Sequence, residues 1–564
     1  MGYTKLALGA FVIFAMVRFV HELHGFSLVI ATIVLFVILA VFHELVLARI
    51  RKLNAVIAFY ERGLARLEDR WAGKGEGGER FIRDTHPYAR DLDLFGRGSA
   101  FELLCTFRTR AGQEMLARWL LEPASPAEIE TRQRAVQELR GRIQFREELF
   151  TAGDMIRFGL HPEALTEWAG QRLPFQSHRV PIVAVLLAVL WIGTVAFALA
   201  GGSYWLLILI SGINIFVNSE FKKRLGDDFS TESATDDLAL LAKVLRIIER
   251  EHFNSERLMG LRKSLAAGEI AASTLIKRLD RINRFLEHES NMVIRFVNPF
   301  IFYKVLCTVW GDRWRRKYGT KVRTWLDAAG EVESIAALSC YAFEHPEDAW
   351  PEFCGEGPLF EAEMLAHPLL PEKQAVRNDV KLGEGLRLIV LSGPNMSGKS
   401  TFVRGVGINA VLAQCGAPVR ARRLRMSSLA VGTSICVLDS LQGGVSRFYA
   451  EIKRLKTISD LTRARIPVLF LLDELLSGTN SQDRLRGSEL LVRTLVEQGA
   501  IGFITTHDLA LARIPESMDG RARNYHFDDH LENGKLRFDF KLKEGVVQTS
   551  NALRLMESIG LLNV

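Results

Sequence analysis

The sequence predicts a chain of three parts: a C-terminal α/β domain, an all-α region before it, and two hairpins of apolar helices. The pattern Gly-x-x-x-x-Gly-Lys-Ser at residues 393–400 follows an apolar run and precedes a helix-like stretch, which is typical of a nucleotide-binding α/β domain. Apolar residues recur at helical spacing in the region before it, and four apolar runs approach the length of a membrane span.

Length, charge and cysteine usage limit the number of domains, the classes of partner and the state of the thiols. The 564 residues suggest three or four domains, since one hydrophobic core rarely serves so long a chain. With 72 Lys and Arg against 65 Asp and Glu, the net charge of +7 permits nucleic acid or anionic lipid as a partner. The six cysteines form no Cys-x-x-Cys pair, which predicts reduced, mostly buried thiols rather than a zinc site or a disulfide framework.

Two uncharged apolar runs, residues 26–42 and 181–200, are long enough to cross a bilayer. Two weaker runs, 6–17 and 204–217, adjoin them across very short connections, so we expect two membrane hairpins; whether the weaker runs span fully stays open. A secretory signal peptide is the alternative for the first run, but no small-residue cleavage site precedes the second.

Basic residues predict the orientation of both hairpins, because positive charge favours the cytoplasmic side. They are Arg49, Arg51, Lys52, Arg179, Lys222, Lys223 and Arg224. We therefore expect a multi-pass inner-membrane protein with its large segments in the cytoplasm. The expected division is a hairpin with its flank at 1–52, a helical core at 53–178, a hairpin at 179–218, the rest of the core at 219–345 and the α/β domain at 346–564.

Within the helical region, residues 55–71 predict an amphipathic helix, and Pro123 and Pro126 separate two helices of the stretch 92–149. Residues 292–310 are almost wholly apolar and fit either a buried helix, which we prefer, or an interfacial one. Residues 313–318 alternate basic and aromatic side chains. Such a patch can grip phosphate backbones or lipid headgroups, or it can be a solvated helix face.

The loop at residues 393–400 has a defined chemistry. Its glycines let backbone N–H groups surround phosphate oxygens, and the helix that follows points its positive end at them. Lys399 is predicted to reach the β and γ phosphates of ATP, and Ser400 to hold Mg²⁺. The predicted ATP-binding residues are Gly393, Pro394, Asn395, Met396, Ser397, Gly398, Lys399, Ser400 and Thr401.

Two further strands end in candidate catalytic residues. The apolar run 468–472 leads into Asp473 and Glu474, and a buried strand would deliver both at its carboxyl end, where ligands bind in open α/β sheets. We predict that Asp473 completes the Mg²⁺ shell and that Glu474 orients and deprotonates the attacking water. His507, after the run 501–505, is a candidate sensor of the γ-phosphate; the alternative is a histidine that caps its strand.

At this point residues 367–564 resemble the ATPase domain of the MutS family, which is akin to the ABC ATPases. The resemblance rests on His-Pro-Leu-Leu at 367–370, Asn-Asp at 378–379 and Gly-Pro-Asn-Met at 393–396. It implies an ABC-class P-loop ATPase that works as a homodimer, in which Ser446 reaches the γ-phosphate held by the partner and residues 477–483 line the interface. Residues 92–95 and 132–136 are similar to the family's helical core domain, so the resemblance covers about two thirds of the chain.

The sequence also departs from that family. No segment corresponds to the mismatch-reading domain with its Phe-x-Glu wedge or to the connector domain, and residues 219–344 look too short for long clamp arms around DNA. Leu475 to Gly478 partly replaces the family's glycine-rich loop after the second acid. We therefore expect ATP binding with slow hydrolysis, and no mismatch reading by a Phe wedge.

Three functions remain open. The first is a membrane-anchored MutS-like ATPase whose ATP-driven dimer closure acts on DNA, bound non-specifically or by structure. The second is a transport or membrane-remodelling ATPase; the few, weakly polar hairpins and the absence of a Leu-Ser-Gly-Gly-Gln signature argue against export. The third is a nucleotide-gated scaffold for a protein partner.

Overall fold

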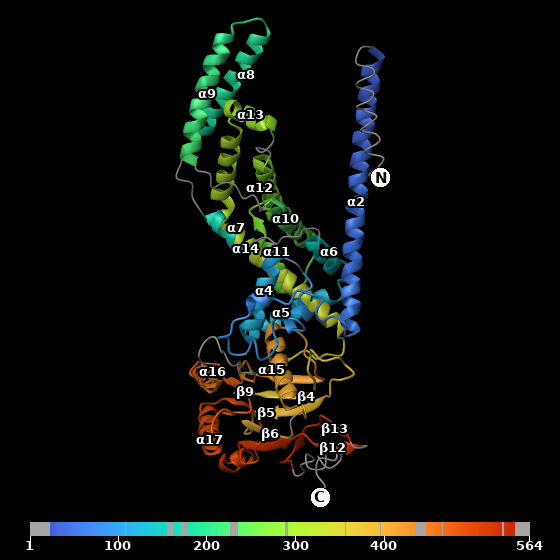
Figure 1. The fold of residues 1–564 in the computed structure, drawn as a ribbon, viewed down its shortest axis with the longest axis vertical. Helices are drawn as coiled ribbons and strands as arrows, with labels where there is room; N and C mark the ends of the chain where they lie inside the picture. The colour runs from blue at the N-terminus through green and yellow to red at the C-terminus, as the bar shows by residue number, and fades with distance from the viewer. Residues whose placement is uncertain are drawn as a thin grey trace.

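The computed structural model describes residues 23–107, 109–154, 162–170, 179–225, 235–287, 292–355, 357–394, 396–435, 447–464, 466–532 and 535–547. The molecule is elongated, with apolar helices at one end, a helical body in the middle and an α/β domain at the other end (Figure 1). The predicted apolar run 6–17, Asn395, Cys436 and Ser446 lie outside the described residues.

The first described helix, α2 (Leu23–Leu67), runs without a break from the apolar end to the helical body (Figure 1). Its 45 residues join the predicted apolar run 26–42 to most of the predicted amphipathic helix 55–71. The prediction of two separate elements is therefore wrong. Residues 43–54 contain neither glycine nor proline, so nothing in the backbone interrupts the helix between them.

Short capped helices build the helical body. The N-cap of α4 (Arg110–Leu121) is Thr109, whose hydroxyl accepts from Gly112 N at 3.1 Å, and Pro126 opens α5 (Pro126–Arg140) as predicted. The others are α3 (Ala100–Leu104), α6 (Ile143–Asp154), α7 (Pro162–Gly170), α10 (Thr235–Arg250), α11 (Glu256–Ser264) and α12 (Ala272–Glu287).

The 42-residue helix α14 (Tyr303–Glu344) is the axis of this body, and Trp325 and Val332 on it are fully buried. It packs against α4, α5, α7 and α12, so helices that precede and follow residues 179–225 in the sequence share one core. The predicted patch 313–318 lies on α14. Its binding interpretation is wrong for Trp314 and Arg315: both are buried, Trp314 Nε1 donates to Leu275 O at 2.9 Å, and Arg315 pairs with Asp312 at 2.9 Å.

The hairpin of α8 (Arg179–Leu199) and α9 (Tyr204–Leu225) projects from the body (Figure 1). By length and composition alone, three described helical segments could cross a membrane: Ile30–Leu67, Val180–Leu199 and Tyr204–Phe221. The predicted single helix at 292–310 is instead broken. The helix α13 (Met292–Ile301) ends before Phe302, whose φ of 55° is left-handed, and α14 begins at Tyr303.

The α/β domain contains a six-stranded sheet of order β14-β11-β6-β10-β9-β8, parallel except for β14. Its strands are β6 (Leu388–Ser392), β8 (Ala430–Ser434), β9 (Val468–Asp473), β10 (Ile501–Thr506), β11 (Ala522–His526) and β14 (Lys543–Glu544). The three predicted strands at 388–391, 468–472 and 501–505 are confirmed, and each is one residue longer than predicted.

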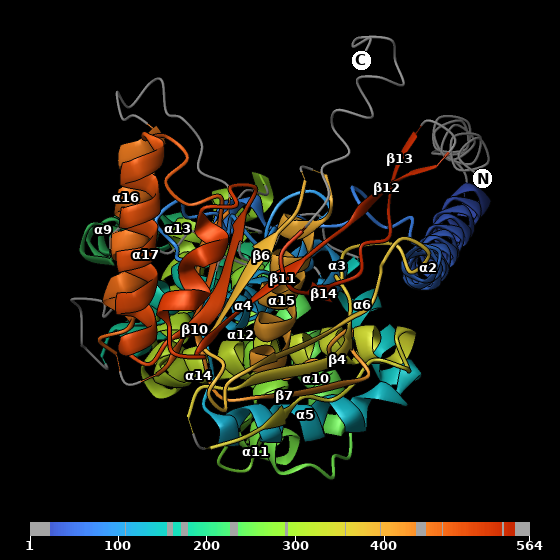
Figure 2. The same cartoon turned by 90° about the horizontal axis from the view of Figure 1, so that it is seen from below.

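The two faces of this sheet have different neighbours (Figure 2). Ile389 and Leu391 of β6 pack in the core that includes α15 (Lys399–Cys415) and the helical body. Leu388 and Val390 pack in a second core with α16 (Arg447–Leu461) and α17 (Ser481–Glu497). The domain is thus a sandwich of helix, sheet and helix layers, with its parallel strands buried on both faces.

Smaller strands complete the structure. A four-stranded sheet of order β3-β7-β4-β5 consists of β3 (Glu352–Phe353), β7 (Arg423–Met426), β4 (Phe360–Leu365) and β5 (Asn378–Leu382). Two-stranded ribbons are formed by β1 (Ala266–Ala267) with β2 (Ile270–Ala271) and by β12 (Asp529–Glu532) with β13 (Lys535–Phe538).

Candidate functional site

The loop between β6 and α15 forms a cradle. Gly393 has φ 148° and Gly398, the N-cap of α15, has φ 95°. A Cβ on Gly393 would lie 2.9 Å from Phe527 O, and one on Gly398 would lie 2.9 Å from Phe540 Cδ1, so neither position accepts a side chain. The N-terminus of a 17-residue helix therefore faces an open loop, which is the backbone arrangement that binds phosphate.

Lys399 closes over this loop. Its Nζ donates to Gly393 O at 2.8 Å and to Pro394 O at 2.9 Å, and the side chain is buried. Burial lowers the pKa of Lys399, while Asp473 and Glu474 oppose that shift. A phosphate in the loop would stabilise the charged form of Lys399, which burial disfavours.

Ser397 offers a further sign that the loop fits a ligand. Its hydroxyl is buried, with 1% of the residue exposed, and it has no hydrogen-bond partner in the described part of the chain. Buried polar atoms are seldom left unpaired, so phosphate oxygens in the cradle would satisfy this one. The glycine cradle, Lys399 and Ser397 together fit a nucleotide phosphate.

The structure brings Ser400 and Asp473 together, as Mg²⁺ binding requires. Ser400 Oγ donates to Asp473 Oδ2 at 2.7 Å, and the Thr505 hydroxyl donates to the other carboxylate oxygen. Parallel pairing of β9 and β10 aligns Asp473 with Thr505. A hydroxyl and a carboxylate are oxygen ligands of the kind that Mg²⁺ prefers, so the pair fits this ion.

Glu474 and His507 form a second pair at the same edge of the sheet. His507 Nδ1 lies 3.1 Å from Glu474 Oε1, and the two side chains are 49% and 36% exposed. Glu474 has φ 48°, and its N–H donates to Thr505 O at 3.2 Å, which turns the chain sharply after β9. Sequence reasoning placed both residues near the γ-phosphate but did not foresee that they contact each other.

The helix α16 is tied to the loop after Glu474. Glu451 is buried, and its Oε1 accepts from Leu476 N at 2.7 Å. Within the predicted interface segment 477–483, the Asn480 side chain caps α17 by accepting from Asp483 N at 2.9 Å. A buried hydrogen bond thus joins α16 to the loop after β9, and the candidate Ser446 lies outside the described residues.

An apolar cavity of about 490 Å³ opens beside the phosphate loop, and sequence reasoning missed most of it. It is lined by Gly398, Thr401 and Phe402 on one side and by Leu370, Val376, Phe527 and Phe540 on others. The position of Phe540 depends on Asn378, which donates to Phe540 O at 3.0 Å and accepts from Leu542 N at 2.8 Å. Only the resemblance at residues 367–370 and 378–379 pointed to this region.

His367 forms part of the same cavity and is uncharged at neutral pH. Burial, followed by Arg404 and Arg420, lowers its pKa to about 4. A neutral, largely apolar wall next to a phosphate cradle suits a flat heteroaromatic base.

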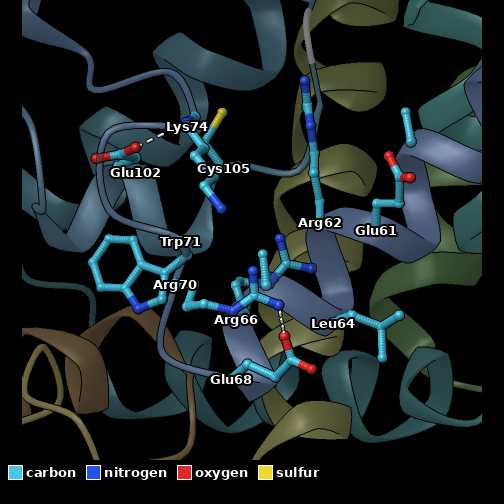
Figure 3. Close-up of a pocket in the computed structure, with 13 residues that line it drawn as sticks. Glu61, Arg62, Leu64, Arg66, Glu68, Arg70, Trp71, Lys74, Glu102 and Cys105 are labelled. Atoms are coloured by element: carbon cyan, nitrogen blue, oxygen red, sulfur yellow. Dashed lines mark hydrogen bonds and ion pairs between the residues drawn. The ribbon is translucent and has the colours of Figure 1, made fainter.

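A second cavity, of about 510 Å³, lies where α2 meets the helical body (Figure 3). Several of its charged groups are already engaged: Arg70 pairs with Glu68, Arg66 with Glu344, and Glu102 accepts from Gly75 N at 2.8 Å and Gly98 N at 2.6 Å. Burial raises the pKa of the Cys105 thiol to about 12, which makes it unreactive. This cavity shows none of the chemistry found at the phosphate loop.

Comparison with known proteins places the phosphate-loop site in context. Residues 389–563 match the family model described as MutS domain V. The DNA mismatch repair protein MutS of Aquifex pyrophilus is 34% identical over 239 residues, 41% of this chain and 27% of that protein. Endonuclease MutS2 of Thermomicrobium roseum is 32% identical over 206 residues, 35% of this chain and 24% of that protein. The chain thus spans about a quarter of the length of these curated relatives.

Proposed function

We propose, from the premise that the chain belongs to the MutS family, that it is a membrane-anchored ATPase which couples ATP binding and slow hydrolysis to closure of a dimer on DNA. Domain V is the ATPase domain of this family, so ATP hydrolysis in general follows from the match. One observation carries the catalytic part of the proposal: the contact of 2.7 Å between Ser400 and Asp473 beside an open phosphate cradle.

The residues of the site support a direct hydrolysis. With a nucleotide in the cradle, Lys399 would exchange the carbonyls of Gly393 and Pro394 for the phosphates, and Ser400 and Asp473 would hold Mg²⁺. When bound, Mg²⁺ neutralises charge on the phosphates. Glu474 takes a proton from the attacking water as the water oxygen bonds to the γ-phosphorus and the bond from that phosphorus to the β–γ bridging oxygen breaks, so that ADP and phosphate form. His507 fixes the orientation of the Glu474 carboxylate from 3.1 Å.

Two arguments support a dimer: the resemblance to the MutS family, and the exposure of site residues in a single protomer. Met396 at the tip of the phosphate loop is 88% exposed, and Glu474 and His507 remain half-exposed in a single protomer. A partner whose Ser446 segment covers this face would exclude water from the reacting phosphate and complete the site.

The position of the apolar helices in the molecule supports membrane anchoring. The apolar parts of α2 and of the α8–α9 hairpin project to the same end of the molecule, opposite the ATPase domain (Figure 1). Side chains such as Leu186 and Val189 on α8 are 64% and 62% exposed, which water would disfavour and lipid would not. With the basic flanks inside, the ATPase domain and helical body face the cytoplasm.

The DNA part of the proposal has a separate test. Relatives of this chain are named as DNA mismatch repair proteins and endonucleases, and the net charge of +7 is compatible with phosphate backbones. DNA binding by the detergent-solubilised full chain is measured over a series of salt concentrations. Affinity should fall steeply as salt rises. Affinity no higher than that of an unrelated control protein, with no salt dependence, would remove DNA from the proposal.

One observation favours an alternative, in which ATP-driven closure moves the membrane helices for transport or remodelling. Both α2 and α14 run from the apolar end towards the ATPase domain, and they are joined by the buried pair Arg66 and Glu344, whose Nε and Oε2 lie 2.6 Å apart. Site-specific crosslinking between the α8–α9 hairpins of two protomers, with and without ATP, tests this function. A crosslink pattern that ATP leaves unchanged would argue against it.

A further inference from the structure

The helix α13 lies against the α8–α9 hairpin partway along its length, below the tip (Figure 1). The ring of Phe300 stacks on Trp191 of α8, with centroids 4.9 Å apart and planes at 9°. The carbonyl of Phe300 accepts from Asn214 Nδ2 of α9 at 2.9 Å. The end of α13 is therefore fixed at the level of Trp191 and Asn214.

The level of these contacts can be compared with the length of the hairpin. The apolar spans are 20 residues in α8 (Val180–Leu199) and 18 residues in α9 (Tyr204–Phe221). A hydrocarbon core about 30 Å thick needs about 20 helical residues. If the hairpin crosses the bilayer, both helices must therefore lie in the hydrocarbon along the whole length of these spans.

Trp191 is 191 − 180 = 11 residues from Val180, and Asn214 is 221 − 214 = 7 residues from Phe221. At about 1.5 Å per residue these positions are about 17 Å and about 10 Å from the end of the hairpin next to the helical body. Phe300, which contacts both, then lies well inside the hydrocarbon rather than at its surface.

The break between α13 and α14 is built for such an environment. Phe302 is buried and left-handed, and its N–H donates to Asn298 O at 2.9 Å. The N–H of Lys304, the second residue of α14, donates to Asn298 Oδ1 at 3.0 Å. Asn214 is fully buried, and it satisfies the carbonyls of Phe300 and, at 3.3 Å, Leu187. Irregular backbone persists in a membrane only where protein groups satisfy it in this way.

We infer that α13 and the first turns of α14 form a re-entrant elbow, which enters the bilayer from the cytoplasmic side beside the α8–α9 hairpin and contacts acyl chains through Phe296. Phe296 is 79% exposed, and at the break itself Phe302 and Val305 are buried with Val180, Ala184 and Ala188 of α8 in one apolar cluster. This inference rests on the proposed membrane anchoring and adds a lipid-facing segment that is too short to span by itself.

The charged residues of the elbow are compatible with this position. Arg295 is exposed on α13, and Lys304 is half-buried at the start of α14. Long basic side chains of this kind extend their charges towards the headgroups while their methylenes remain in hydrocarbon. Anionic headgroups on the cytoplasmic side would favour them.

The experiment measures the depth of position 296 in the intact protein. A nitroxide is attached to Phe296→Cys in the full chain, with Cys354→Ser and Cys436→Ser, and the protein is reconstituted in phosphatidylcholine and phosphatidylglycerol vesicles. The relaxation of the label by oxygen, which enters hydrocarbon, is compared with relaxation by a water-soluble nickel complex. Leu186→Cys on α8, 64% exposed, is the lipid control, and Met259→Cys on α11, 49% exposed, is the water control.

We expect the label at 296 to behave like the label at 186, with relaxation by oxygen and loss of relaxation by nickel, and unlike the label at 259. If the label at 296 is relaxed by nickel like the label at 259, while the label at 186 is relaxed by oxygen, the elbow is wrong and the membrane anchoring stands. If the label at 186 is also relaxed by nickel like the label at 259, the hairpin is not in the bilayer, and the proposed anchoring and the elbow are both wrong.

Discussion

The ATPase site and the helical half of the molecule use polar side chains in opposite ways. Within the described residues around the phosphate loop, the Ser397 hydroxyl has no hydrogen-bond partner, Lys399 Nζ donates to two carbonyls of its own loop, and Glu474 is 36% exposed. In the helical half, Glu344 is engaged by Arg66, and Asn214 Nδ2 donates to two backbone carbonyls. The first set is arranged for a ligand, and the second holds helices together.

This contrast predicts that substitutions in the first set change chemistry with little change in stability, whereas substitutions in the second set do the reverse.

Glu474→Gln should lower the rate of ATP hydrolysis by about 10²- to 10⁴-fold, the usual contribution of a general base, while ATP binding persists. Phosphate release and nucleotide affinity are measured on the same sample. Glu489→Gln, on the outer layer helix α17, is the matched control and should retain the wild-type rate. Turnover that is unaffected by Glu474→Gln would contradict the assignment of this carboxylate.

Arg66→Ala should destabilise the fold by about 3–5 kcal/mol, because it leaves a buried carboxylate unpaired. The side chains of Arg66 and Glu344 are each 8% exposed, and two hydrogen bonds of 2.6 Å join them. Urea unfolding is measured for each single variant and for Arg66→Met with Glu344→Leu. The double variant should recover most of the loss, and equal losses in the single and double variants would show that the pairing is unimportant.

Lys399→Ala should weaken ATP binding roughly 10- to 100-fold, as expected when a charge-assisted hydrogen bond is lost. Its melting temperature without nucleotide should stay close to that of the wild type, since Lys399 contacts only carbonyls of its loop. Lys381→Ala, at an exposed pair with Glu384, is the control for loss of a positive charge. A marked fall in stability of the Lys399 variant would break the contrast between the two halves.

Glu333→Gln should remove a pH dependence of stability. Glu333 lies on α14 and accepts a hydrogen bond from the Thr109 hydroxyl, and burial raises its pKa from 4.5 to about 8. The folded state therefore binds a proton more tightly than the unfolded state, so stability falls as pH rises from about 4.5 to about 8. Unfolding at several pH values, with Glu489→Gln as the control, measures the difference in slope. An unchanged slope in Glu333→Gln would show that Glu333 does not titrate in this range.

The sequence was informative where local chemistry is decisive. Pro126 determines where α5 begins, and the absence of glycine and proline from residues 43–54 lets α2 continue from its apolar part into its amphipathic part. Strands that end in Ser392, Asp473 and Thr506 were found because buried parallel strands are uninterrupted apolar runs.

Long-range contacts explain what the sequence did not reveal. Phe540 reaches the phosphate loop through Asn378, which is 162 residues away along the chain. The sequence predicts a binding patch that includes Trp314 and Arg315, because basic and aromatic residues are neighbours there. The packing of α14 instead turns both side chains into the core, which the local sequence does not indicate. The break at Phe302 was missed because the sequence around it is apolar and helical in character.

The sequence by itself determined the nucleotide-binding loop, the acids at the end of β9 and the apolar spans, because each depends on residues close together in the chain. Only the tertiary structure decided which polar groups are free for a ligand and which are already paired. Hydrogen bonds such as those of Glu474 with His507, Arg66 with Glu344, and Asn214 with Phe300 join residues that are far apart in sequence, and their geometry exists only once the helices and strands have packed.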